Sequence, residues 1–311
     1  MTTSIASPLA AEATTTPRRR SPQWTMDRAQ RRVFGVLRWV VIAGFLIAVL
    51  VPFYYMVLLS VKPIEALLQD PSSLWVSPSD FTLQTYAEVL ASPLKGGQGF
   101  GQFMINSGIV AVASVALALL LGIPGAYAIA RLPFIGRRQV SGIFLAAYLF
   151  PAILMAIPLF VGFTRLGLRG SLVGLIVVYT AQTVPVAIYM LRNYFETVPE
   201  SIEEAGLVDG LGRIGVLRQI SLKLAMPSIM STGLFVFMIA WNEFLFALLF
   251  LVDRPGRWTV SLGLSQLSGS VEVPTTVLMA GSVVLTLPII IIFFATERLL
   301  TGGLTAGAEK G

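Results

Sequence analysis

Residues 203–227 read EEAGLVDGLGRIGVLRQISLKLAMP and form the longest polar interruption in the second half of a chain that is otherwise mostly apolar. The apolar segments on either side, about residues 172–191 and 228–252, are long enough to cross a bilayer as helices of about 20 residues. A polar segment between two spans lies in water, because polar groups are costly in lipid. The pattern predicts an all-α, polytopic membrane protein with an ordered loop at one membrane face.

Two short helices are predicted in and just before this stretch. Thr197, Pro199 and Glu200 fit a capping box, with the Thr197 hydroxyl over the first turn. Asp209-Gly210 ends the first helix, because Gly readily adopts the left-handed conformation. The second helix places four apolar residues at helical spacing: Ile214, Leu217, Ile220 and Leu224. The loop is thus expected to be acidic at one end and basic toward the other.

The composition indicates that most of the chain lies in a membrane. Hydrophobic residues make up 55% of it, charged residues only 12%, and the mean hydropathy is +0.80, whereas about a quarter of the residues in soluble proteins are charged. The chain has no Cys and no His, which excludes thiol catalysis, disulfides, haem and the common zinc sites. The net charge of +6 comes from basic residues beside apolar spans, a pattern that favours membrane orientation over nucleic-acid binding.

Six apolar segments are long enough to span a bilayer. They cover residues 34–59, 103–129, 140–163, 172–191, 228–252 and 276–296. Between the first two lies a polar outer segment, in which FTLQTYAEVL is expected to form an amphipathic helix against the membrane. An even number of spans puts both termini on one side. That side carries sixteen of the Lys and Arg residues and the other side six, so the positive-inside rule makes both termini cytoplasmic.

The chain is therefore expected to divide into four parts. Residues 1–32 form a disordered, basic cytoplasmic tail, since they are rich in Ser, Thr, Ala, Pro and Arg. Residues 33–102 hold the first span and the outer amphipathic segment. Residues 103–298 form the core with the polar loop 192–227, and residues 299–311 form a cytoplasmic C-terminal tail.

The polar loop carries a motif at five positions: Glu204, Ala205, Gly210, Ile220 and Leu222. At these residues the chain resembles the permease subunits of binding-protein-dependent ABC importers, and among them the carbohydrate branch typified by the maltose transporter. Asp209 also matches, whereas Gly206 and Lys223 replace the usual Ala and Pro. The resemblance implies the type I importer permease fold. It also implies that residues 199–227, with Glu203 among the contacts, form a coupling loop that docks on an ATP-hydrolysing subunit.

Two further segments strengthen the resemblance. Trp241, Asn242 and Glu243 lie within the fifth apolar segment, and an acid there is costly unless it faces a polar path or a packing partner. In the resembling branch this helix lines the pathway, so these three residues are pathway candidates. The chain ends GLTAGAEKG, much as that branch does. The resemblance implies that this tail enters the ATPase dimer through six residues: Leu304, Thr305, Ala306, Gly307, Glu309 and Lys310.

The sequence contains no G-x-x-x-x-G-K-[ST] phosphate-binding motif, so ATP and Mg²⁺ are expected on a partner and no cofactor on this chain. The predicted protein is a non-catalytic permease of a bacterial cell membrane that imports a carbohydrate, such as a maltose- or trehalose-like di- or oligosaccharide. The resemblance implies four partners: a second homologous permease, a dimer of ATP-binding subunits, an extracytoplasmic sugar-binding protein and membrane lipid. Nucleic acid is not among them.

Alternatives remain open from the sequence. An ion-coupled secondary carrier would need inverted repeats and several ionisable residues at mid-membrane, and only Glu243 is of that kind. A membrane-embedded enzyme would need a cluster of nucleophile, base or metal ligands, which is missing from a chain without Cys and His and with few buried acids. The same type of importer could carry a different solute, such as glycerol phosphate, and the sequence does not name the sugar.

Overall fold

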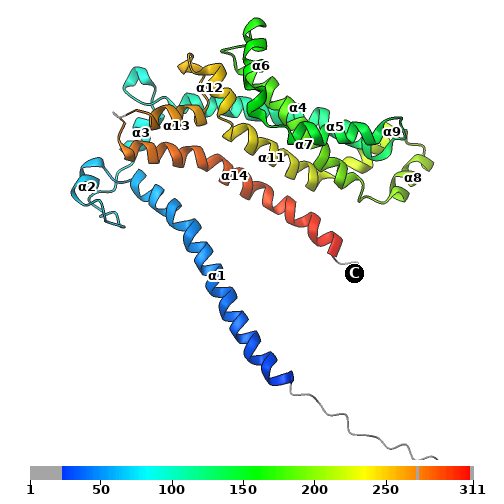
Figure 1. The fold of residues 1–311 in the computed structure, drawn as a ribbon, viewed down its shortest axis with the longest axis horizontal. Helices are drawn as coiled ribbons and strands as arrows, with labels where there is room; N and C mark the ends of the chain where they lie inside the picture. The colour runs from blue at the N-terminus through cyan, green and yellow to red at the C-terminus, as the bar shows by residue number, and fades with distance from the viewer. Residues whose placement is uncertain (1–22, 271–272, 309–311) are drawn as a thin grey trace, which may run out of the picture. The chain divides into compact units, whose positions relative to one another are not determined.

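The computed structural model describes residues 23–270 and 273–308, and it describes side chains at residues 30–270 and 273–297. The described residues form helices, turns and connecting segments, without any strand (Figure 1). The chain divides into two compact units, residues 1–54 and 55–311. The predicted all-α fold is confirmed.

The first unit contains most of α1, a helix that extends from Gln23 to Ser60. The most apolar 18-residue window within residues 30–60 of this helix has a mean hydropathy of 2.5, and none of this window is buried within the chain. Apolar side chains exposed along a whole helix fit a lipid or protein environment rather than water. The first predicted span therefore lies within one continuous helix, which also includes residues 23–32 of the predicted disordered tail. Residues 1–22 of that tail lie outside the described residues.

The second unit is built on four helices: α4 (Phe100–Arg131), α7 (Leu172–Phe195), α11 (Met226–Asn242) and α14 (Thr275–Ala308). Helix α4 packs against α7 and α11, and α11 packs against α14. Small residues allow the close approach of α4 and α7, because a Cβ atom added at Gly122 would lie 3.2 Å from the Cβ of Ala187. Lipid tails are as apolar as these side chains, so close packing of this kind is what holds membrane helices together.

Two of the predicted spans are not continuous helices. The third consists of α5 (Arg137–Leu149) and α6 (Ala152–Arg165), which meet at 90°. Pro151 lies between them and cannot extend α5, since it has no backbone N–H. The fifth consists of α11 and α12 (Leu245–Leu251), with a break at Glu243 and Phe244. By length and composition the described residues contain four helices able to span a membrane. The number rises to as many as six if each of two bent pairs counts as one span: α5 with α6, and Arg213–Leu224 with α11, which meet at 77°.

The segments that link these helices are packed rather than loose. After α1 come α2 (Ile64–Gln69), α3 (Gln84–Leu90) and the turn η1 (Pro93–Lys95). The predicted amphipathic helix is α3, which packs on α14 and α4 with Val89 fully buried. Between α12 and α14 come η3 (Pro255–Arg257) and α13 (Val260–Ser268). The Asn106 side chain on α4 holds this segment, because it donates to the carbonyls of Gly256 (3.2 Å) and Trp258 (2.9 Å).

The polar loop folds into four short helical pieces: α8 (Glu200–Val208), α9 (Arg213–Val216), the π turn η2 (Leu217–Ser221) and α10 (Leu222–Leu224). The predicted end of the first helix is confirmed, because Gly210 has a φ of +90°. The predicted capping box is wrong. Pro199 occupies the N-cap position without a side-chain hydrogen bond to α8, and the Thr197 hydroxyl instead donates to the carbonyl of Tyr194 (2.7 Å).

The second helix of the loop is less regular than predicted. Its π turn breaks the regular helical register, so Val216 and Ser221 are buried while Ile214 is 73% exposed. A regular spacing would have placed Ile214 with the buried residues. Packing of η2 against α8 sets the register here, and the sequence pattern alone misplaced Ile214.

Candidate functional site

The polar loop exposes apolar and acidic side chains together. Ile202 and Val208 of α8 are 42% and 87% exposed. We define the loop surface as these two residues with five exposed neighbours: Glu204, Ala205, Asp209, Gly210 and Ile214. Exposed apolar side chains that gather beside polar ones are typical of surfaces that contact another protein or a membrane. Four of the predicted coupling residues, Glu204, Ala205, Asp209 and Gly210, lie on this surface.

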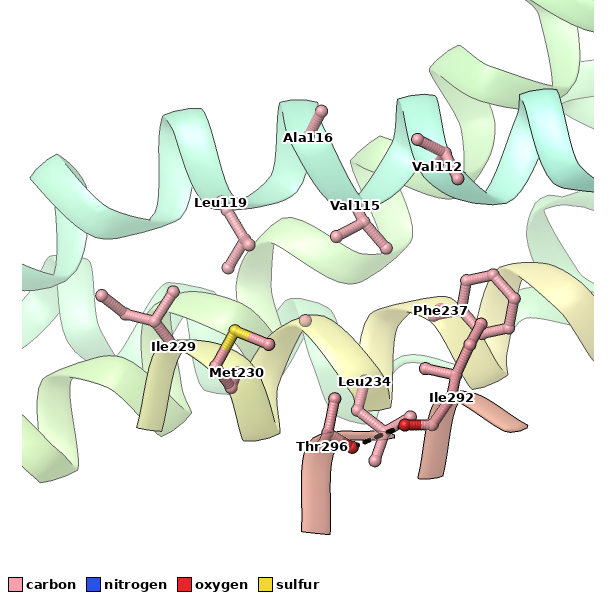
Figure 2. A pocket seen from close by; sticks show the side chains of 11 residues that line it. Val112, Val115, Ala116, Leu119, Ile229, Met230, Leu234, Phe237, Ile292 and Thr296 are labelled. Carbon is pink, nitrogen blue, oxygen red and sulfur yellow. Dashed lines mark hydrogen bonds between the residues drawn. The ribbon is translucent and has the colours of Figure 1, made fainter. Parts of the chain in front are cut away.

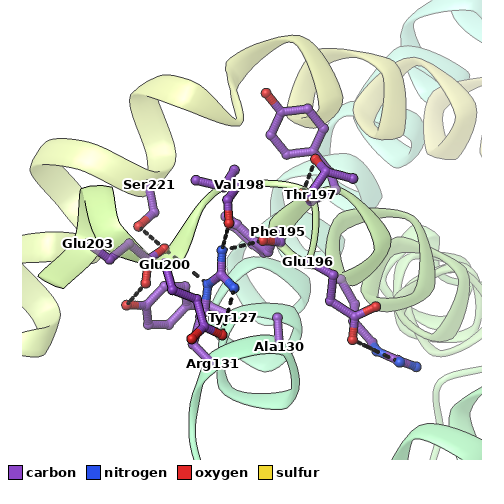
Figure 3. Close-up of polar contacts among 12 residues, drawn as sticks. Tyr127, Ala130, Arg131, Phe195, Glu196, Thr197, Val198, Glu200, Glu203 and Ser221 are labelled. Atoms are coloured by element: carbon purple, nitrogen blue, oxygen red, sulfur yellow. Dashed lines mark hydrogen bonds and ion pairs between the residues drawn. The ribbon is translucent and has the colours of Figure 1, made fainter. Parts of the chain in front are cut away.

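Glu203, the neighbour of Glu204, points inward and is 3% exposed. The Tyr127 hydroxyl of α4 donates to Glu203 Oε2 (3.2 Å), and the Ser221 hydroxyl of η2 donates to Glu203 Oε1 (2.9 Å). Figure 3 shows these side chains meeting from three elements, and with Arg131 they form what we call the Glu203 cluster. Glu203 therefore holds α8 to α4 and η2 from inside the loop.

Arg131, the last residue of α4, joins the loop to the end of α7. Its Nη2 donates to the carbonyls of Phe195 (2.6 Å) and Val198 (2.5 Å). Its Nε lies 3.3 Å from Glu203 Oε1, a charge contact without hydrogen-bond geometry, and its Nη1 lies 3.5 Å from Glu200 Oε1. Carbonyls at a helix C-terminus lack partners and favour a cation. Arg131 thus closes the end of α7 and the start of α8 onto α4.

The Glu203 cluster is a buried charge pair whose polar atoms mostly have partners. The side chains of Arg131 and Glu203 are 6% and 4% exposed. Taking two charges out of water is costly, so such a pair is tolerated only when hydrogen bonds surround it, and removing one partner costs about 3–5 kcal/mol. Here the carboxylate accepts from two hydroxyls and the guanidinium donates to two carbonyls. The position of the loop on α4 is therefore set by electrostatics as well as by packing.

Gly206, which departs from the resembling family, lies at the contact between α8 and η2. A Cβ atom added there would lie 2.5 Å from Ile220 Cδ1 and 3.4 Å from Val216 Cγ2. The glycine therefore lets Ile220 pack close against α8. Ile220 and Leu222 are only partly exposed, so these two predicted coupling residues pack within the loop, unlike Glu204.

The three pathway candidates at the end of α11 have different surroundings. Trp241 is 3% exposed, and its Nε1 donates to the carbonyl of Leu285 on α14 (3.0 Å). Trp241 therefore packs inside the bundle. Asn242 is exposed, and its side-chain amide donates to the carbonyl of Met238 one turn earlier (2.9 Å).

Glu243 lies in the break between α11 and α12. Its carboxylate accepts the backbone N–H groups of Phe246 (2.9 Å) and Ala247 (3.3 Å), and the Tyr179 hydroxyl of α7 donates to it at 2.5 Å. The first N–H groups of a helix have no partner within that helix, so the carboxylate caps α12 where lipid offers no hydrogen bonds. The acid inside the predicted span thus stabilises a helix break that the sequence interpretation did not foresee.

Asn242 faces a polar pocket of about 480 Å³ between α11, α13 and α14, which we call the Asn242 pocket. Its polar side chains are those of five residues: Asn242, Ser261, Ser265, Ser268 and Ser282. Sequence reasoning missed the serines, although Ser261, Ser265 and Ser268 recur at the i, i+4, i+7 spacing of one helix face. This spacing was the feature of the sequence from which a polar helix face could have been predicted.

A second pocket, of about 300 Å³, lies between α4, α11 and α14 (Figure 2). It is lined by Val112, Val115, Ala116, Leu119, Ile229, Met230, Gly233, Leu234, Phe237, Ile292 and Thr296. Thr296 carries the only hydroxyl among these residues, and it donates to the carbonyl of Ile292 (2.8 Å). The pocket therefore suits apolar groups and offers little to a hydrophilic solute.

The predicted C-terminal tail begins as helix, because α14 continues through Ala308. The backbone of four predicted contact residues belongs to this helix: Leu304, Thr305, Ala306 and Gly307. The other two, Glu309 and Lys310, lie outside the described residues. Within the described part of the chain, no group of three or more His, Cys, Asp or Glu could hold a metal ion.

Comparison with known sequences agrees with this architecture. The family described as "Binding-protein-dependent transport system inner membrane component" matches residues 115–302. The inner membrane ABC transporter permease protein YcjP of Escherichia coli (strain K12) is 38% identical over 271 residues, which cover 87% of this chain and 94% of that protein. The trehalose/maltose transport system permease protein MalG of Thermococcus litoralis is 34% identical over 274 residues, 87% of this chain and 96% of that protein.

A solved structure shares the fold. It is a crystal structure of a bacterial ABC transporter involved in the import of the acidic polysaccharide alginate, and the match has a TM-score of 0.73 and 24% identity over 86% of this chain and 97% of that chain. The matched family region extends from α4 to α14 and includes the loop surface. The chain belongs to the family of inner membrane components of binding-protein-dependent transport systems, and it is a permease subunit of an ABC importer.

Proposed function

We propose that this chain and a second, homologous permease form the translocation pathway of an ATP-driven importer for a di- or oligosaccharide of the maltose or trehalose kind. The similarity to a trehalose/maltose permease supports this class of sugar. The chain itself is non-catalytic in this proposal. A dimer of ATP-binding subunits holds ATP and Mg²⁺ and performs the hydrolysis.

The observation that carries the proposal is the opposite orientation of two neighbouring acids. Glu204 is exposed on the loop surface, whereas Glu203 is buried against Arg131. The ATPase dimer docks on the loop surface, where exposed apolar side chains gain from burial. When the docked ATPase moves α8, the Glu203 cluster transmits this movement to α4, because the buried charge pair and its hydrogen bonds connect α8, η2 and α4.

The proposal places both termini and the loop surface in the cytoplasm of a bacterial cell, because Lys and Arg gather on that side. The outer segments that contain α3 and α13 then face outward, where an extracytoplasmic sugar-binding protein delivers the solute. The C-terminal residues 304–310 add a second contact with the ATPase dimer. Continuation of α14 through Ala308 supports this contact, since it extends the helical backbone past the predicted end of the span.

Reconstitution tests the proposed function. The chain is purified alone and together with its second permease and ATPase, and ATP turnover and uptake of radiolabelled trehalose or maltose into proteoliposomes are measured. We expect no turnover by the chain alone, and uptake by the complex that requires both ATP and the binding protein. Turnover by the chain alone, or uptake driven by an ion gradient without ATP, would refute the assignment.

Charge reversal tests the loop surface. Glu204→Lys places a cation among the acids of α8, so we expect the ATPase to copurify at least tenfold less well while membrane insertion is unchanged. Glu88→Lys is the matched control, because Glu88 is also an exposed acid on a short helix but lies in the outer segment. Equal copurification of the ATPase with both variants would rule out docking at the loop surface.

A further inference from the structure

The Asn242 pocket brings polar side chains together from α11, α13 and α14. Its volume of about 480 Å³ lies within the range of small-molecule sites, about 300–1,000 Å³. Hydroxyl and amide groups that face lipid are energetically costly. The presence of five such side chains in one pocket therefore indicates that water, a solute or a polar partner occupies it.

Three of the four serine hydroxyls donate their hydrogen atoms to the protein itself. The bonds run from Ser261 to the carbonyl of Trp241 (2.8 Å), from Ser268 to that of Ser265 (2.8 Å) and from Ser282 to that of Leu278 (2.9 Å). A hydroxyl that donates in this way keeps its lone pairs. The Asn242 amide nitrogen likewise donates to Met238 and leaves its side-chain oxygen free to accept. The pocket therefore presents mainly hydrogen-bond acceptors to its occupant.

Among the residues that the structure describes, the remaining lining is apolar and includes no charged residue. Phe244 lines the pocket from the break between α11 and α12 and is 36% exposed. Its ring offers a flat apolar surface, which suits the C–H face of a sugar ring. Acceptors beside an aromatic wall fit a ligand with many hydroxyl donors. They disfavour an anion, because the described lining contains no Lys or Arg to compensate its charge.

We propose that the Asn242 pocket is a binding subsite for a neutral, polyhydroxylated solute, namely a sugar without a carboxylate, phosphate or sulfonate group. This chain then contacts the cargo itself and discriminates against anionic sugars. The inference rests on the proposed function, since a sugar reaches the pocket only along the translocation pathway. The pocket lies at the end of α11 and the start of α14, which face outward in the orientation proposed above.

Removal of single acceptors tests the subsite. Ser265→Val and Ser282→Ala each delete one hydroxyl of the lining. Thr286→Val is the matched control, because the Thr286 hydroxyl also donates one turn back on α14, to the carbonyl of Ser282 (2.8 Å), but does not line the pocket. The complete transporter is reconstituted, and trehalose and maltose uptake is measured at a fixed concentration of liganded binding protein. We expect each pocket variant to lower the uptake rate about two- to tenfold, as the loss of one hydrogen bond implies, and the control to leave it unchanged.

Thiol labelling gives a readout that does not depend on transport. The chain has no Cys, so Ser265→Cys creates its single thiol, which a maleimide modifies. We expect saturating trehalose to slow this labelling several-fold in the complex and glucuronate to leave it unchanged. Ser79→Cys is the control, because Ser79 is exposed in the outer segment and does not line the pocket. Its labelling should not respond to either sugar.

The outcomes separate this inference from the proposed function. Wild-type sugar import with unchanged uptake by both pocket variants, and without protection of the thiol, would overturn the subsite alone. Failure of the wild type to import either neutral sugar would overturn the proposed function and the subsite with it. Loss of the second permease from the complex in Ser265→Val, but not in Thr286→Val, would show that the pocket is a subunit contact and would also overturn the subsite.

Discussion

Replacing Glu203 by Gln removes one charge from inside the polar loop with almost no change in shape. The carboxylate accepts hydrogen bonds from Tyr127 and Ser221 and lies 3.3 Å from the Nε of Arg131. The amide of Gln keeps one acceptor, so one of the two hydroxyls must turn and accept instead. Hydrogen bonds to a charged group contribute about 1.5–3 kcal/mol and neutral ones about 1 kcal/mol. We expect Glu203→Gln to destabilise the loop by about 2 kcal/mol, and Glu203→Ala by about 3–5 kcal/mol.

Thermal unfolding of the purified complex, followed by tryptophan fluorescence, measures this loss, and limited proteolysis shows whether the loop opens first. Glu204→Gln is the matched control, because it changes the same group one residue away on the exposed loop surface. We expect Glu204→Gln to leave the unfolding temperature unchanged and to weaken the binding of the ATPase to the loop surface. Glu203→Gln should lower the unfolding temperature and expose the loop to protease.

A double-mutant cycle with Arg131→Met isolates the charge pair. We expect the two substitutions to be non-additive by at least about 1 kcal/mol, because residues in one network share their interaction energy. Additivity within about 0.5 kcal/mol, or an equal loss of stability in Glu203→Gln and Glu204→Gln, would refute the reasoning.

Three further changes have defined outcomes. Gly210→Val puts a β-branched side chain at a φ of +90°, which is strained, so the loop should lose protease resistance and ATPase binding; an unchanged digestion pattern would contradict this. Glu243→Leu leaves the N–H groups of α12 and the Tyr179 hydroxyl without their acceptor, so the unfolding temperature should fall by more than it does in Glu243→Gln; equal melting of both variants would argue against the cap. In Gly206→Ala, a gain in helix propensity of about 1 kcal/mol offsets the cost of displacing the flexible Ile220 Cδ1, so the free energy of unfolding should change little. In Gly206→Val the larger side chain should loosen the packing of α8, which faster proteolysis of the loop would show.

The spans were predictable because the bilayer imposes the same length and apolarity on every helix that crosses it. Predicted spans 103–129 and 172–191 correspond to α4 and α7 within a few residues at each end. The end of α8 was predictable for a local reason as well, since Gly210 adopts a backbone conformation that other residues avoid. Features set by the solvent or by one residue's own conformational range can be derived from the sequence.

Breaks within the apolar segments could not be placed in this way. The fifth span looks continuous in sequence because the segments before Asn242 and after Glu243 are apolar. The break is stable because Tyr179 on α7 and the free N–H groups of α12 meet one carboxylate, and this meeting depends on how α7 and α11 pack. The serine-lined Asn242 pocket arises likewise from three helices that only the fold brings together.

The sequence determined that a polar loop with two adjacent acids follows the fourth span, and it showed Glu203 and Glu204 as chemically identical groups. Only the tertiary structure decided that Glu203 faces Arg131 and Glu204 faces water. The physical reason is that burial of a carboxylate requires a cation and hydroxyl donors at fixed distances. Arg131 and Tyr127 come from α4 and Ser221 from η2, so the partners of Glu203 exist only once the loop has folded against α4.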